Sequence, residues 1–465
     1  MSKAKEVKKS VTTAQAILLI VISIAVVILG LTVVKTPKPI LLMVDGAIIT
    51  CLAVLFGIPY KAVQTDIVGC IKAMIVPILI VLCVGMMVGA WMISGTVPVM
   101  IYYGMKLISP SVFFFMACLI CAVMSLVMGS SWGTVSTVGI AFMGMAAGLN
   151  ISLPITAGAI VSGALFGDKL SPLSDSPVLS SAITETNIFE GIRHAAMTTG
   201  PALLLSLVFY LVMGMHHATG VATDENYSLI LNTLEKTFHL NMILLLPPVL
   251  VFILIMMKKP TLPVFAAGIV SAGILAVLFQ GADFNSLTAA LNAGYTNTTD
   301  VAIVDSMLKR GGMNGMLGTA ALLIASGVFG GPLRAAGVVD ILLEQIERVA
   351  KTWKSMAMGV LVVHAGFLVI TGSYDVSYTV VGQMARDLFD KYNLQRKNLM
   401  RILLDTGVGF APLIPWSVMG VFIANTLSVP TTTFLLYSPL LWLSPLICII
   451  YILTGFSTAK IDPEK

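Results

Sequence analysis

The sequence predicts an all-α polytopic membrane protein, and two observations carry that prediction. Of its 465 residues, 57% are hydrophobic and only 11% are charged, whereas a soluble domain has about a quarter charged residues. Long apolar runs also recur along the whole chain, and roughly 20 apolar residues span a bilayer as a helix. The alternative, a barrel, needs short alternating strands, and the sequence does not contain them.

Nine runs have the length and composition of a membrane helix: 14–34, 41–58, 74–93, 112–128, 195–215, 240–257, 262–280, 356–371 and 434–454. Further segments, interrupted by Gly and Pro, lie between them, so we expect about 11–13 crossings. The first run follows Lys3, Lys5, Lys8 and Lys9 and lacks a small-residue cleavage site. We therefore expect a retained first helix in the inner or plasma membrane, with a cytoplasmic N-terminus.

The chain divides into two similar halves. Residues that set backbone shape match at a constant offset of 243 (from 129 to 372), as in Gly129 and Gly372, Asn150 and Asn393, and Pro172 and Pro415. We expect a cytoplasmic N-terminus and first transmembrane helix in 1–40, repeat 1 in 41–215, an external loop and linking helix in 216–261, and repeat 2 in 262–465. The run 41–58 would start outside, whereas its counterpart 262–280 follows Lys258 and Lys259 and would start inside. The repeat is therefore predicted to be inverted.

Four segments break the apolar pattern with Gly, Pro and hydroxyl residues: 129–134, 167–177, 371–375 and 405–417. Backbone freed from helical hydrogen bonds is tolerated in a membrane only where protein or a cavity satisfies it. These segments therefore predict broken helices near the middle of the bilayer. Freed carbonyls and hydroxyls are hard oxygen ligands suited to Na+, whereas the N-termini of half-helices favour an anion.

Carboxylates mark the predicted ion site, because an ionised Asp within a membrane is costly and usually functional. Four lie in or beside the breaks: Asp168, Asp175, Asp375 and Asp405. One such Asp can bind either Na+ or H+ but resists holding both, which is what exchange of the two ions requires. Asp168 and Asp175 are the expected exchanging carboxylates, and Asp375 and Asp405 would complete or tune the site. Structural roles stay open: Asp168 could pair with Lys169, Asp405 with Arg401, and the other two could cap helices.

Neutral oxygens for the same ion would come from hydroxyl residues of the breaks, namely Ser130, Ser131, Thr134, Ser171 and Ser174. These hydroxyls could instead satisfy broken backbone. An organic carboxylate would meet a different set near the half-helix ends, namely Ser373, Trp132, Arg334 and His364. His364 could equally be a hydrogen-bonded core histidine, and Arg334 could pair with an acid.

These segments resemble the NhaC-type sodium/proton antiporter family of the ion transporter superfamily. The resemblance rests on Gly129-Ser-Ser-Trp-Gly-Thr134, Ala157-Gly-Ala-Ile160, Phe166-Gly-Asp-Lys-Leu-Ser-Pro-Leu-Ser-Asp175, Arg310-Gly-Gly-Met313, Asp405-Thr-Gly407 and Pro412-Leu-Ile-Pro-Trp416. It implies an inverted-repeat fold with re-entrant hairpins, and coupling to Na+ or H+. Similar proteins include malate/lactate exchangers and amino-acid transporters. The chain departs from the family at Asp175-Ser-Pro-Val178, where Asp-Thr-Thr-Asn is common.

The predicted function is Na+/H+ antiport. The alternative is a Na+- or H+-coupled transporter or exchanger of a small organic acid, of the malate/lactate type, or of an amino acid. An intramembrane enzyme is disfavoured because no motif pairs a His with a nucleophilic Ser or Cys. The partners are then the lipid bilayer and the ions Na+ and H+, with no cofactor. The sequence has no basic domain outside the membrane, so we expect no nucleic-acid partner. A homodimer is expected by analogy with the superfamily.

Overall fold

The protein is helical throughout the part of the chain that the computed structural model describes, residues 11–34, 36–107, 109–217, 224–257, 259–299, 301–309 and 311–461. Within these residues, eight helices are long and apolar enough to cross a membrane. They are α1 (Thr13–Thr32), α2 (Lys38–Leu55), α3 (Tyr60–Ile93), α5 (Phe113–Met128), α10 (Ile188–His217), α13 (Thr261–Gln280), α16 (Leu317–Ala335) and α18 (Trp353–Thr371).

Three bent helix pairs raise the number of candidate spans to eleven. The pairs are α11 (Asp224–Thr237) with α12 (Leu246–Met256), α21 (Lys397–Phe410) with α22 (Val418–Thr426), and α23 (Thr431–Phe434) with α24 (Pro439–Thr454). Their bends are 94°, 46° and 59°. The expected number of crossings, about 11–13, therefore agrees with the candidate spans only at its lower limit, and only if each bent pair is one span.

Several charges used to predict orientation lie outside the described residues: Lys3, Lys5, Lys8, Lys9 and Lys258. The same holds for Arg310 of the Arg-Gly-Gly motif. Two long polar stretches of the sequence, 216–236 and 283–310, contain helices in the described residues. The first contains α11, and the second contains α14 (Phe284–Ala293) and α15 (Ala302–Leu308).

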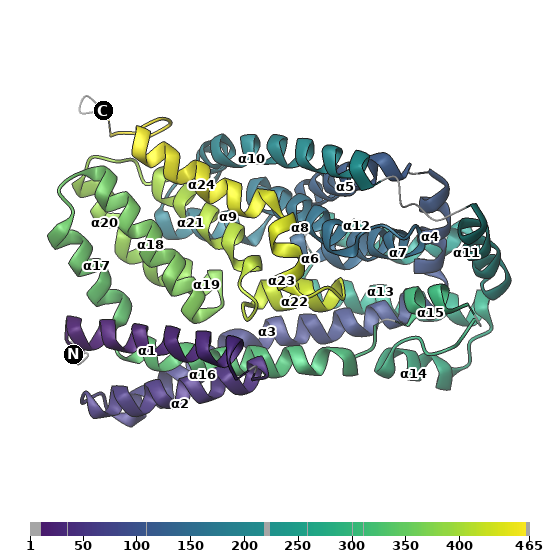
Figure 1. Ribbon diagram of the computed structural model, residues 1–465, viewed down its shortest axis with the longest axis horizontal. Coiled ribbons are helices and arrows are strands. Elements are labelled where there is room, and N and C mark those ends of the chain that lie inside the picture. The colour runs from purple at the N-terminus through teal and green to yellow at the C-terminus, as the bar shows by residue number, and fades with distance from the viewer. Residues whose placement is uncertain are drawn as a thin grey trace.

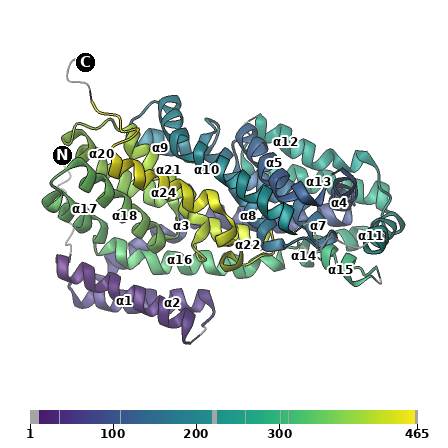
Figure 2. The same ribbon diagram turned by 45° about the horizontal axis from the view of Figure 1, so that its top comes forward.

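Long helices form two layers with short broken elements between them. In Figure 1, α1, α2, α3 and α16 lie along one edge, whereas α5, α10 and α24 lie along the opposite edge. The short helices α6 (Ser131–Thr134), α22 and α23 lie between these layers, near the middle of the molecule. Figure 2 shows α1 and α2 as a pair beside α16, at the outside of the bundle. Broken backbone is thus surrounded by protein, as it must be in lipid.

Glycines allow the closest helix contacts. On α8 (Leu153–Leu170), a Cβ at Gly163 would lie 2.1 Å from the Cys118 carbonyl oxygen of α5. A Cβ at Gly167 would lie 2.2 Å from the Leu126 nitrogen of α5. A Cβ at Gly46 of α2 would lie 2.7 Å from the Val328 carbonyl oxygen of α16. Such close backbone approach is the usual source of helix association in membranes, where packing replaces the hydrophobic effect.

The two halves share a series of elements at matching positions. After α5, Gly129 has a φ of 66°, and α6 is followed by a π turn over Val135–Gly139 and by α7 (Ile140–Gly148). After α18, Gly372 has a φ of 65°, and α19 (Tyr374–Ser377) is followed by a π turn over Tyr378–Gly382 and by α20 (Gln383–Lys391). Asn150 and Asn393, which close the two series, both have a positive φ.

The matching continues on either side of these series. Upstream, α4 (Thr96–Leu107) follows Gly95 and α17 (Val338–Val349) follows Gly337, and both glycines have a positive φ. Downstream, α8 breaks before α9 (Asp175–Thr184), just as α21 breaks before α22. The residues that set backbone shape therefore adopt the same shape twice.

Candidate functional site

Asp168 lies in the last turn of α8, where the chain leaves the helix before α9. Its carboxylate is buried and accepts three hydrogen bonds, from the Ser131 backbone N–H at 3.2 Å, the Ser174 hydroxyl at 2.8 Å and the Ser176 hydroxyl at 2.7 Å. Pro172 cannot continue a helix, and Ser171 is already extended. The broken backbone therefore folds its own hydroxyls back onto the carboxylate.

The break after α5 contacts the break after α8. A Cβ at Gly129 would lie 2.6 Å from the Leu173 Cβ, so glycine is needed for this approach and for its positive φ. Ser130 caps α6 by accepting the Gly133 N–H at 3.1 Å. The hydroxyl of Ser131 is buried and has no hydrogen-bond partner, although its backbone N–H donates to Asp168. The residue whose backbone binds the buried carboxylate therefore also carries an unpartnered hydroxyl.

The second half repeats this contact. The Gly372 carbonyl accepts the Val418 N–H at 2.8 Å, which joins the break after α18 to the start of α22. A Cβ at Gly372 would meet the Trp416 carbonyl oxygen at 3.3 Å. Ser373 precedes α19 without capping it through its side chain.

The two pairs of breaks also meet each other. The Trp132 ring of α6 packs against the Phe422 ring of α22, with centroids 4.2 Å apart. The charges of Asp175 and Asp168 act on Asp375, so the three carboxylates lie within electrostatic range although they come from different halves. Asp175 and Asp375 are exposed, whereas Asp168 is buried. The group thus has one inner and two outer carboxylates.

Asp405 lies within α21 rather than in a break, and its carboxylate belongs to a separate buried group. The Lys169 ammonium contacts it at 2.6 Å, with both side chains 0% exposed. Hydroxyls of Ser444, at 2.7 Å, and Thr198, at 2.9 Å, also donate to it. The suggested pairs between Asp168 and Lys169 and between Asp405 and Arg401 do not occur. Arg401 instead donates to the Ser457 carbonyl at 2.8 Å.

His364 is a buried residue of α18 that stacks on Tyr378 with ring centroids 5.6 Å apart. Its Nδ1 contacts the Thr406 hydroxyl, and that hydroxyl donates to the Ile402 carbonyl at 2.6 Å. Since a hydroxyl has one proton, Nδ1 must be the donor to Thr406. Nε2 then carries a lone pair with no partner. The arrangement is that of a hydrogen-bonded core histidine with one free nitrogen.

The remaining predicted residues have structural contacts. Thr134 donates to the Ser130 carbonyl at 3.0 Å, and the Ser171 hydroxyl accepts the Leu173 N–H at 3.4 Å. Arg334 contacts Asp66 of α3 at 3.7 Å, on the α3–α16 pair. None of these contacts joins them to Asp168.

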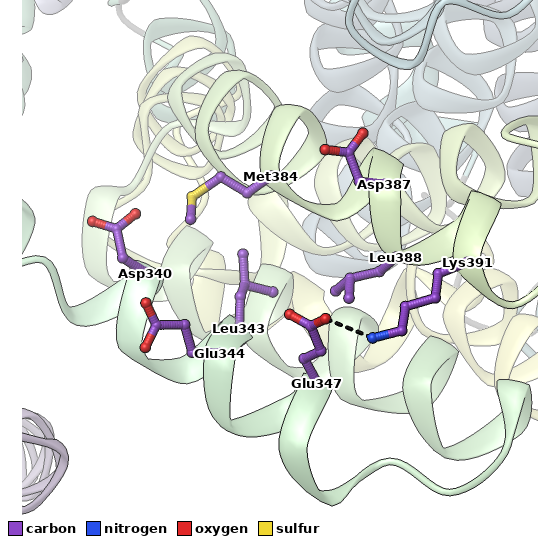
Figure 3. A pocket seen from close by; sticks show the side chains of 8 residues that line it. All are labelled: Asp340, Leu343, Glu344, Glu347, Met384, Asp387, Leu388 and Lys391. Atoms are coloured by element: carbon purple, nitrogen blue, oxygen red, sulfur yellow. Dashed lines mark hydrogen bonds and ion pairs between the residues drawn. The ribbon is translucent and has the colours of Figure 1, made fainter.

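A second group of acids lines an open pocket of about 250 Å³ between α17 and α20, shown in Figure 3. Glu347 contacts Lys391 at 2.8 Å, and this contact raises the pKa of Lys391. Both side chains are exposed, as expected for solvated faces. We therefore do not assign this pocket to the ion site.

The sequence interpretation missed several residues of these groups. Ser176 lies within the predicted break 167–177, directly after the Phe166–Asp175 motif and before Pro177, so its place in the break was visible. Ser444 and Thr198 lie in apolar helices far from any motif, and nothing in their spacing indicated Asp405. Asp45, a lone acid within the apolar helix α2, was also overlooked, although an acid in such a run is a signal.

Comparison with known proteins identifies the family. The profile of the Na+/H+ antiporter family matches residues 163–456, which include the C-terminal part of α8, α9 and α21–α22. The Na+/H+ antiporter NhaC of Bacillus subtilis is 34% identical over 446 residues, 95% of this chain and 98% of that protein. The chain belongs to the Na+/H+ antiporter family. It is accordingly a multi-pass membrane transporter and not an enzyme, and the resemblance to NhaC-type antiporters is confirmed.

Other relatives in the family carry other names. The malate-2H+/Na+-lactate antiporter of Bacillus subtilis is 34% identical over 447 residues, covering 96% of this chain and 95% of that protein. The arginine/ornithine antiporter ArcD of Halobacterium salinarum is 34% identical over 393 residues, covering 83% of this chain and 80% of that protein. Equal identity to three differently named antiporters leaves the solute to be argued from the site.

Proposed function

We propose that the protein exchanges Na+ for H+ and that Asp168 is the carboxylate that binds the two ions in turn. One observation carries this proposal. Asp168 is buried at the contact between two broken helices and is held by hydroxyl and N–H donors, while the adjacent Lys169 ammonium is directed to Asp405. A buried carboxylate without a fixed side-chain cation is suited to a mobile one.

The surrounding oxygens explain how either ion can be held. Without a cation, the Ser174 and Ser176 hydroxyls donate to the carboxylate and stabilise its charge. When Na+ enters, the same hydroxyls can rotate and present lone pairs, and the unpartnered Ser131 hydroxyl supplies a further oxygen. A proton on Asp168 removes the negative charge that attracts Na+. Occupancy by the two ions is therefore mutually exclusive.

Other carboxylates have supporting roles in this proposal. Asp175 and Asp375 are exposed near Asp168, so they attract cations and relay them to the buried group. Asp405 holds its own cation, Lys169, and therefore tunes the site without exchanging ions. The tuning role of Asp405 is within the expectation that Asp375 and Asp405 complete or tune the site, whereas Asp175 was expected to exchange ions together with Asp168.

Alternating access would come from an inverted repeat of 41–215 and 262–465, in the cell membrane with a cytoplasmic N-terminus. The elements that match at an offset of 243, including both π turns and both positive-φ asparagines, support the repeat. The contact between breaks, Gly129 with Leu173 and Gly372 with Trp416, follows the same offset. A homodimer remains a prediction.

Proteoliposomes with a pH-sensitive dye inside test the proposal. Adding Na+ alone should move protons in the wild-type protein, and Asp168→Asn should abolish this movement while the variant still inserts. Asp283→Asn, which changes an exposed acid that caps α14, is the matched control and should transport normally. Unchanged proton movement in Asp168→Asn would refute its role.

The alternative is exchange or cotransport of an organic acid or amino acid, supported by the names of the malate/lactate and arginine/ornithine relatives. Half-helix N-termini at Ser130 and Ser373 would then receive a carboxylate. The same vesicles distinguish the two functions. Proton movement that requires malate, lactate, arginine or ornithine would replace Na+/H+ antiport with this alternative.

A further inference from the structure

A buried carboxyl group lies outside the candidate ion site, in the middle of the apolar helix α2. Asp45 is 0% exposed. Its Oδ2 accepts a hydrogen bond of 2.8 Å from the Ser23 hydroxyl of α1. Its Oδ1 is also buried and has no partner. A charged carboxylate needs all of its lone pairs satisfied, so this environment leaves half of the group unsolvated.

The charged residues of the helices packed around Asp45 do not neutralise it. Helix α1 contains no charged residue over Thr13–Thr32. On α2, Lys38 lies seven residues away, which is about 10 Å along a helix at about 1.5 Å per residue. On α16, the single charged residue is Arg334, which contacts Asp66 of α3. The charged residues of α3 are Lys61, Asp66 and Lys72.

The surroundings of Asp45 are closed on one side and apolar on the other. Next to it, Gly46 packs directly on the Val328 carbonyl of α16. Ser23 lines a cavity of about 450 Å³ whose other walls are mainly aliphatic and aromatic, including Phe329 and Phe367. Within the part of the chain that the structure describes, an ionised Asp45 would therefore have one hydrogen-bond donor and no cationic side chain in contact.

We propose that Asp45 is a second proton-binding site, separate from Asp168, and that loss of its proton loosens the packing of α1 and α2 on α16. The contrast with Asp168 follows from the donors. Three donors stabilise the charged form of Asp168, whereas one donor reaches Asp45. The direction of the pH dependence of stability follows from the burial of Asp45. Because the folded state favours the protonated form of Asp45, the contribution of Asp45 to stability is present at low pH and is lost as pH rises.

Infrared spectroscopy of the purified protein tests the protonation directly, without transport. At neutral pH in Na+-free buffer, the carbonyl stretch of a protonated carboxylic acid should be present, and Asp45→Asn should remove the Asp45 component. Asp66→Asn, on the adjacent helix, should leave that component unchanged. The Asp168→Asn variant should also retain it, so the result does not depend on the proposed transport role.

Thermal unfolding tests the consequence for packing. The unfolding temperature of the wild-type protein should fall as pH rises from mildly acidic to alkaline. The unfolding temperature of Asp45→Asn, whose side chain is neutral at every pH, should fall less over the same range. An unchanged carboxylic-acid band in Asp45→Asn, or parallel pH profiles of the two proteins, would overturn the proposal. If Asp45→Asn does not fold, Ser23→Ala serves instead. It removes the hydrogen bond to Oδ2 and should shift the Asp45 band, and an unshifted band would refute the site.

Discussion

The Lys169 ammonium lies 2.6 Å from the Asp405 carboxylate, and this buried ion pair joins α8 to α21. Its neighbour in sequence, Asp168, faces three hydrogen-bond donors from the broken segments instead. One turn of α8 therefore presents a carboxylate held by neutral hydrogen-bond donors and an ammonium paired with a second carboxylate. The proposed division of roles between Asp168 and Asp405 rests on this arrangement.

Replacing Lys169 alone should be strongly destabilising. Lys169→Met leaves the Asp405 charge buried without its cation, and breaking such a pair costs about 3–5 kcal/mol. The double variant Lys169→Met with Asp405→Asn removes both charges and keeps an amide for the Ser444 and Thr198 hydroxyls. It should recover much of the loss. Unfolding of the detergent-purified variants, followed by fluorescence, measures both effects.

Transport by the double variant tests whether Asp405 only balances Lys169. We expect Na+-driven proton movement to persist in vesicles, because Asp168 is unchanged. If the double variant folds as well as the wild-type protein but transports nothing, Asp405 takes part in ion exchange itself.

Removing the free hydroxyl beside Asp168 should weaken Na+ binding. Ser131→Ala removes one oxygen ligand, and a loss of about 1.4 kcal/mol would raise the Na+ concentration for half-maximal exchange roughly tenfold. Ser136→Ala is the matched control, since its buried hydroxyl donates to the Trp132 carbonyl at 2.7 Å. The Na+ dependence of proton movement measures both. Equal Na+ dependence in the two variants would remove Ser131 from the site.

Stability should depend on pH through Glu185, which ends α9 with a positive φ of 53°. Its carboxylate accepts hydrogen bonds from Arg396 and Arg386, and these two guanidinium groups hold the pKa of Glu185 below its usual value. A lowered pKa in the folded state stabilises the protein above the usual titration range and loses this contribution as pH falls. Glu185→Gln should therefore lower the unfolding temperature at neutral pH, and the difference should shrink in acid. A difference that is constant with pH would contradict this origin.

Helix contacts through glycine predict a clear difference between two Ala substitutions. At Gly163, a Cβ would lie 2.1 Å from the Cys118 carbonyl oxygen, and forcing α5 and α8 apart should cost about 1–3 kcal/mol. At Gly200 of α10, nothing lies within 4 Å of the added atom. Gly200→Ala should be neutral or stabilising, because Ala favours helix by about 1 kcal/mol. Comparison of unfolding temperatures measures both, and equal effects would contradict the packing.

The breaks were predictable from the sequence because Gly, Pro and Ser act locally on the backbone. Gly129 and Gly372 end their helices as expected, and Asp168 lies at a break as expected. The bend between α21 and α22 falls on the predicted break 405–417, whereas the bend between α23 and α24 was not predicted. The run 434–454 was expected to be one span, but the chain bends between α23 and α24 near Pro439.

Side-chain partners across the fold were not predictable in the same way. Lys169 is adjacent to Asp168, and Arg401 is four residues from Asp405, so local spacing favoured two pairs that do not form. The observed pair, Lys169 with Asp405, depends on how α8 and α21 pack, which no local pattern specifies. Asp45 could have been found from the sequence, because its helix was predicted and a single acid stands within that apolar run.

The two π turns, Val135–Gly139 and Tyr378–Gly382, give each half one more residue than a regular helix of the same span would contain. An α-helix advances about 100° per residue, so this surplus sets the rotational phase of everything that follows. Deleting a single residue from one π turn would rotate the helix that follows it, α7 or α20, about its axis, while the matching helix of the other half would keep its orientation. Length changes at these two points should therefore be tolerated poorly.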